Sequence, residues 1–359
     1  MRLLRLSRTN RVFGAVRRNH FAAAVVCILL LDGSLTTTAR GDEPDERFRV
    51  MSWNLEWFYD DQDGDNYSKL AKEQSAPSRS DWNWKRDGIA EAIAEAAPDV
   101  VAVQEIENRR VLWYLSRAIQ REHEQDYIEL ALEGRDFFTE QDVGFLFQRQ
   151  STDFRTQGLR NLSRTQRTDD RFADLSKHMI VQFETSFGDA VETVWVINVH
   201  LRAREEAAEL RKAQARTLHS WVRDLITAGE NVIVLGDLNT EHRGDQLSAD
   251  IDVGVVAGKE TTAIEDDLID VTLSVPPGSR VTHVLPDRRF DRILVSRTLI
   301  EDDPTRLDLV FDSFEVLPRL AVRGPADTPE DHWDDYWQRD AATRDLSDHY
   351  PIIADFVWR

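Results

Sequence analysis

Six short stretches of the sequence place polar residues with metal-binding or proton-transferring side chains directly beside an apolar run. They are residues 52–56, 104–107, 198–200, 236–239, 290–292 and 347–349, which read SWNLE, QEIE, NVH, GDLN, FDR and SDH. Carboxylate and amide oxygens are ligands that hard divalent cations prefer, and histidine exchanges a proton near neutral pH. Each stretch alone is also typical of a turn or a solvated strand end. Their shared format predicts that strand ends gather them around one polar crevice.

The elements that would position these residues follow from the apolar patterns between them. Helical spacing predicts helices over 85–97, 111–121 and 205–227. Continuous apolar runs predict buried strands, which lie at 48–53, 100–103, 143–147, 179–183, 194–199, 232–235, 290–295, 309–314 and 352–356. Strands and helices alternate in the first half, and strands dominate the second. This pattern predicts an α/β protein with a layered sheet core, in one catalytic domain over 48–359.

The first 39 residues have the pattern of a secretory signal peptide. Six arginines precede an apolar run at 21–31, and small residues continue to Ala39. The run is shorter than the roughly 20 residues of a membrane span, so an uncleaved anchor is the alternative. A polar linker follows at 40–47. Cleavage would remove Cys27, the single cysteine, and leave a net charge of about −25. The sequence therefore predicts a secreted or periplasmic monomer with no stable membrane insertion after cleavage.

The six stretches, in this order, resemble the motifs of the endonuclease/exonuclease/phosphatase superfamily, which is related to pancreatic-type deoxyribonucleases and apurinic-site nucleases. The resemblance spans roughly 48–357, and its most specific pieces are GDLN at 236–239 and SDHYPI at 347–352. It implies an α/β fold of four layers, a sandwich of two facing mixed β-sheets flanked by helices. It also implies hydrolysis of a phosphodiester or phosphomonoester by water, with Mg²⁺ (or Mn²⁺ or Ca²⁺) as the cofactor.

The resemblance implies a role for each matched residue. The implied metal ligands are Asn54, Glu105 and Asp348. Asp237 would orient or deprotonate the attacking water, and Asn239 would hold a phosphate oxygen. His349, paired with Asp291, would be a protonated donor to the scissile phosphate, because a carboxylate partner raises the pKa of a histidine and fixes its orientation. His200 matches the second histidine of the deoxyribonuclease branch and would also face the phosphate.

Two features depart from the pattern of the superfamily. Lys177 occupies a strand region where an arginine is common, and it would bind substrate as a point charge without the planar fork of arginine. No tyrosine matches the one expected at the site, and Phe145 and Phe147 lie in that region without a hydroxyl. Arg202 is a further candidate for binding a phosphate-rich substrate, with a solvated residue at a helix start as the alternative.

These expectations lead to one function with two alternatives. We expect a metal-dependent phosphodiesterase, specifically a secreted endonuclease that cleaves DNA, with RNA as a second candidate substrate. The strongly acidic chain argues against loose polyanion binding, but bound cations can reverse the field inside one cleft. The alternatives are an enzyme acting on lipid or small phosphoesters, sphingomyelinase-like or inositol-phosphatase-like, and an inactive binding protein.

The acidic loop at 61–65 lacks the spacing of an EF-hand, and a looser Ca²⁺ site there stays open. The acidic and aromatic stretch 328–345 is expected to form a loop or short helix near the site.

Overall fold

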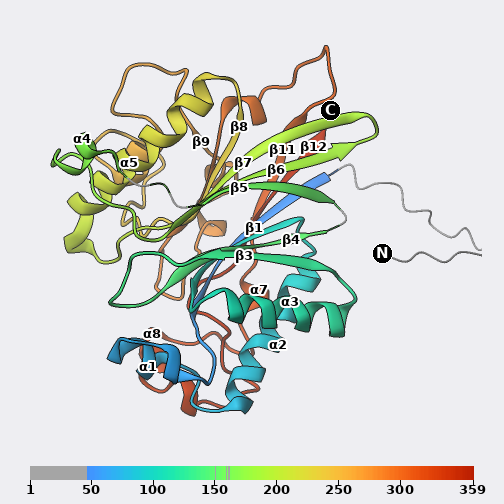
Figure 1. Ribbon diagram of the computed structural model, residues 1–359, viewed down its shortest axis with the longest axis vertical. Coiled ribbons are helices and arrows are strands. Elements are labelled where there is room, and N and C mark those ends of the chain that lie inside the picture. The colour runs from blue at the N-terminus through green and yellow to red at the C-terminus, as the bar shows by residue number, and fades with distance from the viewer. Residues whose placement is uncertain (1–46, 150, 159, 161) are drawn as a thin grey trace, which may run out of the picture. The chain divides into compact units, whose positions relative to one another are not determined.

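The computed structural model describes residues 47–359 except 150, 159 and 161, with the backbone alone at 156–158 (Figure 1). The predicted signal peptide and nearly all of the predicted linker lie outside these residues. Within the described part of the chain, no helix is both long enough and apolar enough to cross a membrane.

Two six-stranded mixed sheets form the centre of the domain. The first sheet contains, in spatial order, β11 (Leu309–Val316), β12 (Ile352–Trp358), β1 (Arg47–Phe58), β2 (Val100–Ile106), β4 (Asp142–Gln148) and β3 (Tyr127–Leu132). The second contains β5 (Thr152–Gly158), β6 (His178–Phe187), β7 (Ala190–His200), β8 (Asn231–Asp237), β10 (Asp291–Val295) and β9 (Ile269–Asp270). Each sheet has one parallel pair at its centre, β1 with β2 and β7 with β8, and its other pairs are antiparallel.

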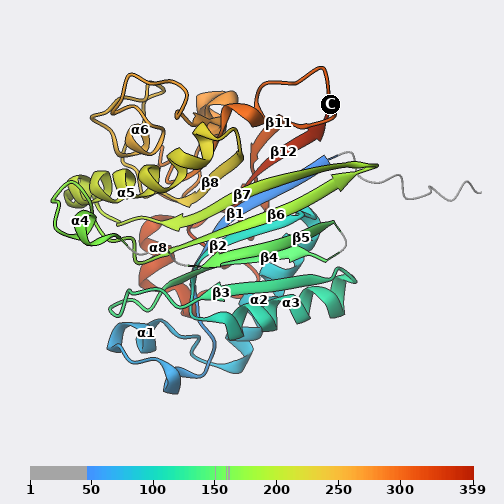
Figure 2. The same ribbon diagram turned by 45° about the horizontal axis from the view of Figure 1, so that its top comes forward.

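Three long helices cover the outer faces of the two sheets. Helices α2 (Arg79–Ala96) and α3 (Arg109–His123) flank the first sheet, and α5 (Ala208–Thr227) flanks the second (Figure 2). Each parallel pair needs a crossover connection, and α2 and α5 lie in those connections. A core of buried side chains from both sheets fills the space between them, including Val50, Phe183 and Ile233. The predicted four-layer α/β sandwich is confirmed.

Local sequence explains where two of these helices begin. The hydroxyl of Ser78 accepts a hydrogen bond from Asp81 N–H, which caps the first turn of α2. The helix therefore starts six residues before the prediction at 85, and it carries Trp82 into the outer core. Asn108 caps α3 by accepting from the amides of Arg110 and Val111. Strands β3, β5 and β9 are not predicted, because their short segments mix charged and apolar residues.

Short helices and turns occupy the connections. They are η1 (Asp63–Asp65), α1 (Lys69–Gln74), α4 (Arg164–Arg167), η2 (Glu205–Ala207), α6 (Asp252–Val256), η3 (Val271–Ser274), η4 (Pro277–Ser279), η5 (Arg297–Leu299), α7 (Pro318–Ala321), α8 (Pro329–Asp334) and η6 (Tyr336–Gln338).

The strand registers bring the predicted site residues to one edge of the sandwich. In the parallel pairs, Asn54 lies opposite Gln104 in the first sheet, and His200 lies opposite Asp237 in the second. Strand β10 runs antiparallel to β8, so its first residue, Asp291, also lies opposite Asp237. Parallel strands end at the same edge of a sheet, and this is why residues from distant parts of the sequence meet there.

Candidate active site

The backbone at the site edge departs from regular strand geometry. Glu56, Trp57, Glu105 and Asn239 all have positive φ angles, of 45°, 47°, 59° and 48°. Residues other than glycine rarely adopt this left-handed backbone conformation, because their Cβ atom crowds the neighbouring carbonyl. The pairing of β2 with both of its neighbours shifts register at Glu105. Such local strain gathers at functional sites, where surrounding contacts hold it in place.

Asn54 joins the two sheets at the centre of the site. Its side-chain NH₂ group donates to Glu105 Oε1 at 3.2 Å and to Asp237 Oδ2 at 3.0 Å. Its oxygen accepts from Glu56 N–H at 2.9 Å. Because this bond uses the oxygen, Asn54 presents its amide nitrogen to the two carboxylates. Its predicted role as an oxygen ligand to a metal stays a prediction, and in this arrangement it holds Glu105 and Asp237 together.

Glu105 is a largely buried carboxylate, with 14% of its side chain exposed, in a region of negative charge. Burial raises the pKa of Glu105 to about 7, and the nearby Asp348 carboxylate adds to the shift. One oxygen accepts from Trp57 N–H at 3.1 Å, and the other lies 3.7 Å from His200 Nε2. A divalent cation would remove the cost of holding these carboxylates together without water.

Asp237 is the point where the polar side chains converge. Asn239 N–H donates to Asp237 Oδ1 at 2.8 Å, and Asn239 Nδ2 donates to Asp237 Oδ2 at 3.1 Å. The same Oδ2 lies 3.5 Å from His200 Nε2 and 3.7 Å from His349 Nε2. Burial raises the pKa of Asp237, which makes this carboxylate a better proton acceptor than an exposed aspartate.

The two histidines of the site differ in charge. His349 Nδ1 lies 2.8 Å from Asp291 Oδ2. Burial alone would lower the pKa of His349, but the carboxylates of Asp291 and Asp237 outweigh it and raise the pKa well above its ordinary value. For His200, burial and the positive charges of Lys177 and His349 lower the pKa well below its ordinary value. The surroundings of His349 therefore favour its protonated form, and those of His200 favour its neutral form.

Asp348 is held by residues that the sequence did not single out. Its Oδ2 accepts from Trp333 Nε1 at 3.1 Å and lies 3.3 Å from His283 Nε2. The backbone N–H of Leu285 donates to His283 Nδ1, so Nε2 carries the proton that faces Asp348. His283 lies outside the six stretches, and no local pattern marks it. Trp333 belongs to the aromatic stretch 328–345, which the structure places against the site.

A second buried network lies behind Asp348. Glu56 Oε2 accepts from Asp348 N–H at 3.0 Å and lies 2.7 Å from His332 Nε2. On its other side, His332 Nδ1 lies 3.1 Å from Asp327 Oδ2, and Arg339 pairs with the other Asp327 oxygen. Asp327, His332 and Asp345 have metal-ligand spacing, but His332 and Arg339 already supply the positive charge there. This network positions the backbone that carries Asp348.

The two predicted substrate-binding residues lie at the margin of the site. Lys177 Nζ donates to Gln141 Oε1 at 2.7 Å and pairs with Asp136 Oδ2 at 3.0 Å. Its charge still reaches Glu105, where it lowers the carboxyl pKa against the effect of burial. Arg202 is exposed on the loop that follows His200. The structure thus brings all five predicted catalytic residues and the three predicted metal ligands to one edge, with Lys177 and Arg202 at its rim. Phe145 and Phe147 are core residues between the sheets.

The residues of this edge fit a divalent cation. Two overlapping groups have polar side-chain atoms within 4.8 Å of one another, Asp237 with Asp291 and His349, and His283 with Asp348 and His349, and their carboxylates supply the ligand oxygens because both histidines carry a proton on the nitrogen that faces the site. Among the described residues, the buried Asp291 Oδ1 has no hydrogen-bond partner, so an acceptor remains to be satisfied there. Hard oxygen donors of this kind suit Mg²⁺, Mn²⁺ or Ca²⁺.

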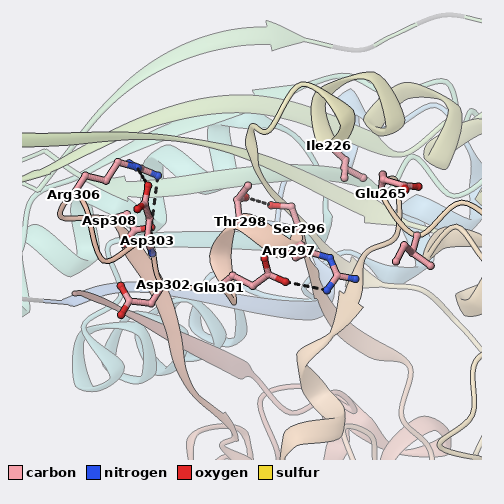
Figure 3. A pocket seen from close by; sticks show the side chains of 11 residues that line it. Ile226, Glu265, Ser296, Arg297, Thr298, Glu301, Asp302, Asp303, Arg306 and Asp308 are labelled. Carbon is pink, nitrogen blue, oxygen red and sulfur yellow. Dashed lines mark hydrogen bonds and ion pairs between the residues drawn. The ribbon is translucent and has the colours of Figure 1, made fainter.

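A separate cavity of about 670 Å³ lies at the opposite end of the second sheet (Figure 3). Its wall includes Ser296, which directly follows β10, whereas Asp291 begins that strand at the site edge. Two ion pairs join charged residues of the wall, Arg297 with Glu301 and Arg306 with Asp303. This cavity contains none of the predicted site residues.

The acidic loop that raised the question of a Ca²⁺ site is held by arginines. Arg79 pairs with Asp61 at 3.1 Å, and Arg110 pairs with Asp65 at 2.7 Å. The Ca²⁺ site at 61–65 stays an untested expectation, and the ion pairs account for the placement of the loop.

The fold and the site define a four-layer α/β sandwich whose strand ends gather carboxylates and histidines suited to a divalent cation and an anionic ester. The chain belongs to the Endonuclease/Exonuclease/phosphatase family, whose model matches residues 51–349. Members of this family are generally metal-dependent phosphoester hydrolases. The comparison with curated proteins found no match.

Solved structures share the fold at low sequence identity. A humanized D. rerio TDP2 carrying 14 mutations has a TM-score of 0.53 and 15% identity, with 87% of this chain and 99% of that chain covered. The human Nocturnin catalytic domain with bound sulfate has a TM-score of 0.52 and 15% identity, with coverage of 88% and 95%. An endonuclease/exonuclease/phosphatase family protein from Bacteroides thetaiotaomicron has a TM-score of 0.52 and 14% identity, with coverage of 87% and 98%. These likenesses support the fold.

Proposed function

We propose that this protein is a secreted or periplasmic endonuclease that uses a divalent cation, Mg²⁺ first, to hydrolyse phosphodiester bonds of DNA, with RNA as a second substrate. The observation that carries the proposal is the position of Asp237. Its Oδ2 accepts from two amide groups and lies within 3.7 Å of both site histidines. A buried carboxylate in this position can receive the proton of an attacking water while the histidines face the phosphate.

Each remaining residue has a defined task in this proposal. Asp291 orients His349 through Nδ1, which leaves the protonated Nε2 to donate to a phosphate oxygen. Asn54 and Asn239 fix the Asp237 carboxylate, so that little reorganisation is needed during the reaction. The amide nitrogen of Asn239 donates to Asp237 and to Leu201 O, and its predicted contact with a phosphate oxygen stays a prediction. Neutral His200 donates to a second phosphate oxygen without adding another charge. When bound by Glu105 and Asp348, the cation would neutralise charge on the phosphoryl oxygens.

The choice of nucleic acid rests on the resemblance of His200 to the second histidine of the deoxyribonuclease branch. The choice of compartment rests on the signal-peptide pattern of residues 1–39. Sequencing of the N-terminus of the exported protein would test the compartment and the cleavage after Ala39. Recovery of an uncleaved, membrane-bound chain would contradict it.

The test of substrate is a comparison across phosphoester classes. The purified mature chain would be offered plasmid DNA, RNA, sphingomyelin and inositol polyphosphates, each with Mg²⁺, Ca²⁺ or EDTA. We expect internal cuts in DNA with Mg²⁺ and no turnover in EDTA. Cleavage of sphingomyelin or inositol polyphosphate without cleavage of DNA would overturn the nuclease proposal. Inactivity on every substrate with every cation would favour the binding-protein alternative.

A further inference from the structure

A second cavity, of about 300 Å³, lies beside the proposed metal centre. Its walls include the aromatic side chains of Trp57, Trp333, Tyr336 and Trp337, together with Glu56 and Lys85. Trp333, Tyr336 and Trp337 lie in the stretch 328–345 that was expected near the site, whereas Trp57 was not singled out by the sequence. They come from the end of β1 and from the segment around α8 and η6, which the sequence separates by more than 270 residues.

Two of these aromatic residues contact the proposed metal ligands directly. The backbone N–H of Trp57 donates to Glu105 Oε2, and Trp333 Nε1 donates to Asp348 Oδ2, each at 3.1 Å. The cavity therefore borders two residues that contact the proposed metal ligands, so a group bound in it would lie close to the metal centre.

The walls suit a flat and polar group. Trp333 lines the cavity and is 48% exposed, although large aromatic residues usually bury most of their surface. At the inner end, Lys85 is only 2% exposed. Within the described part of the chain, its ammonium makes one hydrogen bond, to Glu56 O at 2.5 Å, and it carries three donors. The ammonium otherwise faces the rings of Tyr336 and Trp337, and an acceptor oxygen or nitrogen of a ligand would bind its remaining donors more strongly than a ring face does.

The position of Lys85 also argues against a cationic ligand. Its ammonium lies 4.8 Å from the centre of the Tyr336 ring and 5.8 Å from that of Trp337. Aromatic walls that recognise a quaternary ammonium offer their faces to the cation of the ligand. Here the protein's own cation takes that place, so a choline headgroup would meet like charge.

We propose that this cavity is a base-binding subsite that receives one unstacked nucleobase next to the scissile phosphate. The base stacks against Trp57 and Trp333, and Lys85 donates to an acceptor on its edge. Recognition of single bases by aromatic stacking is common where nucleic acid is held without pairing. The inference rests on the proposed nuclease function and adds to it a single-stranded substrate with one base unstacked.

The test uses a single-stranded thymidine oligonucleotide in which one nucleotide is replaced by an abasic tetrahydrofuran. With the end-labelled strand and Mg²⁺, we expect the wild type to lose cleavage about tenfold or more at one fixed offset from the abasic position. The variants Lys85→Met and Trp57→Leu should cut the normal strand more weakly. With the abasic strand, they should show no further loss of cleavage at that offset, the loss that we call the dip. Trp113→Leu is the matched control, because Trp113 is 46% exposed on α3 and should leave the dip unchanged.

The outcomes separate this inference from the proposed function. Even cleavage around the abasic position by the wild type would overturn the subsite and leave the nuclease standing. Failure to cut any oligonucleotide while plasmid DNA is still cut would overturn the subsite, and failure on both would refute the nuclease itself. Binding of thymidine monophosphate in EDTA, followed by tryptophan fluorescence, gives a second measurement if Lys85→Met fails to fold. Saturable quenching that Trp57→Leu abolishes supports the subsite, whereas quenching by phosphocholine and not by the nucleotide overturns it.

Discussion

Asn198 in the second sheet donates a hydrogen bond from its side-chain NH₂ group to the backbone carbonyl of Val103 in the first sheet, at 3.0 Å. The same group donates to Gly144 O at 2.9 Å, and its oxygen accepts from Gln104 Nε2 at 2.7 Å. All of these atoms are buried between the sheets, and Asn198 lies two residues before His200 on β7. This side chain therefore ties together the two halves of the sandwich that supply the site.

Replacement of Asn198 by leucine should lower the free energy of unfolding by about 3 kcal/mol, because three buried partners lose their hydrogen bonds. Urea unfolding of the two proteins at pH 7 would measure the difference. Asn83→Ala, at a half-buried position of α2, is the control and should change stability by less than about 0.5 kcal/mol. Equal urea midpoints of unfolding for Asn198→Leu and wild type would show that the hydrogen bonds of Asn198 between the sheets do not contribute to stability.

The His349–Asp291 pair should be essential to turnover. We expect His349→Ala to reduce kcat on DNA by a factor of about 10² to 10⁴, the usual range for a positioned proton donor. Asp291→Asn should also reduce kcat, because it removes the charge that holds the proton on His349. Steady-state kinetics with His123→Ala as the control, at the end of α3, would measure both. Full turnover by His349→Ala would contradict the assigned role.

The pH dependence of stability should reveal His332. Burial opposes its charge, but Glu56, Asp348 and Asp327 raise the pKa of His332 to about 9, against an ordinary value of 6.5. Because the folded pKa is the higher one, this stabilisation is fully present below about pH 6.5 and is lost as the pH rises through 9. A shift of this size corresponds to about 3 kcal/mol.

The measurement is the difference in unfolding free energy between wild type and His332→Gln at a series of pH values. We expect the wild type to be the more stable at pH 6 and the difference to shrink toward pH 9.5. A difference that stays constant across this range would mean that His332 is not charged in the folded protein.

Divalent cations should stabilise the folded chain. A ligand that binds the folded state alone raises the unfolding temperature, so Mg²⁺ or Mn²⁺ at concentrations well above Kd should raise Tm by several degrees over EDTA. Glu105→Gln should abolish most of that shift. Thermal unfolding of this variant and of Glu122→Gln, an exposed position on α3, would test it. An undiminished shift in Glu105→Gln would remove Glu105 from the metal centre.

Salt should weaken cleavage of a polyanion. The chain carries a net charge of −20, so attraction of nucleic acid depends on local positive charge at the cleft. Raising monovalent salt from 50 to 200 mM at constant Mg²⁺ should raise KM for DNA while leaving kcat nearly unchanged. A KM independent of salt would argue for a small or weakly charged substrate.

Much of the fold could be read from the sequence because buried strands leave an unmistakable apolar run. The nine predicted strands and three predicted helices all occur in the structure, with bounds that differ by at most six residues. The start of α2 was missed because the Ser78 cap lies before the apolar spacing begins. Strands β3 and β5 were missed because each lies at the edge of its sheet, where half of the side chains meet solvent.

The sequence by itself determined which chemical groups form the site. Each group lies in one of the six short stretches that adjoin an apolar strand, and the order of these stretches matches the superfamily. Only the tertiary structure decided how they are used. In the structure, the side-chain oxygen of Asn54 accepts from the backbone of Glu56, and His283 and Trp333 contact the Asp348 carboxylate. Tertiary packing also forms the aromatic cavity that Lys85 lines. These contacts join residues that are distant in sequence, and packing of two sheets and a C-terminal segment brings them together. Local patterns carry no record of such partners.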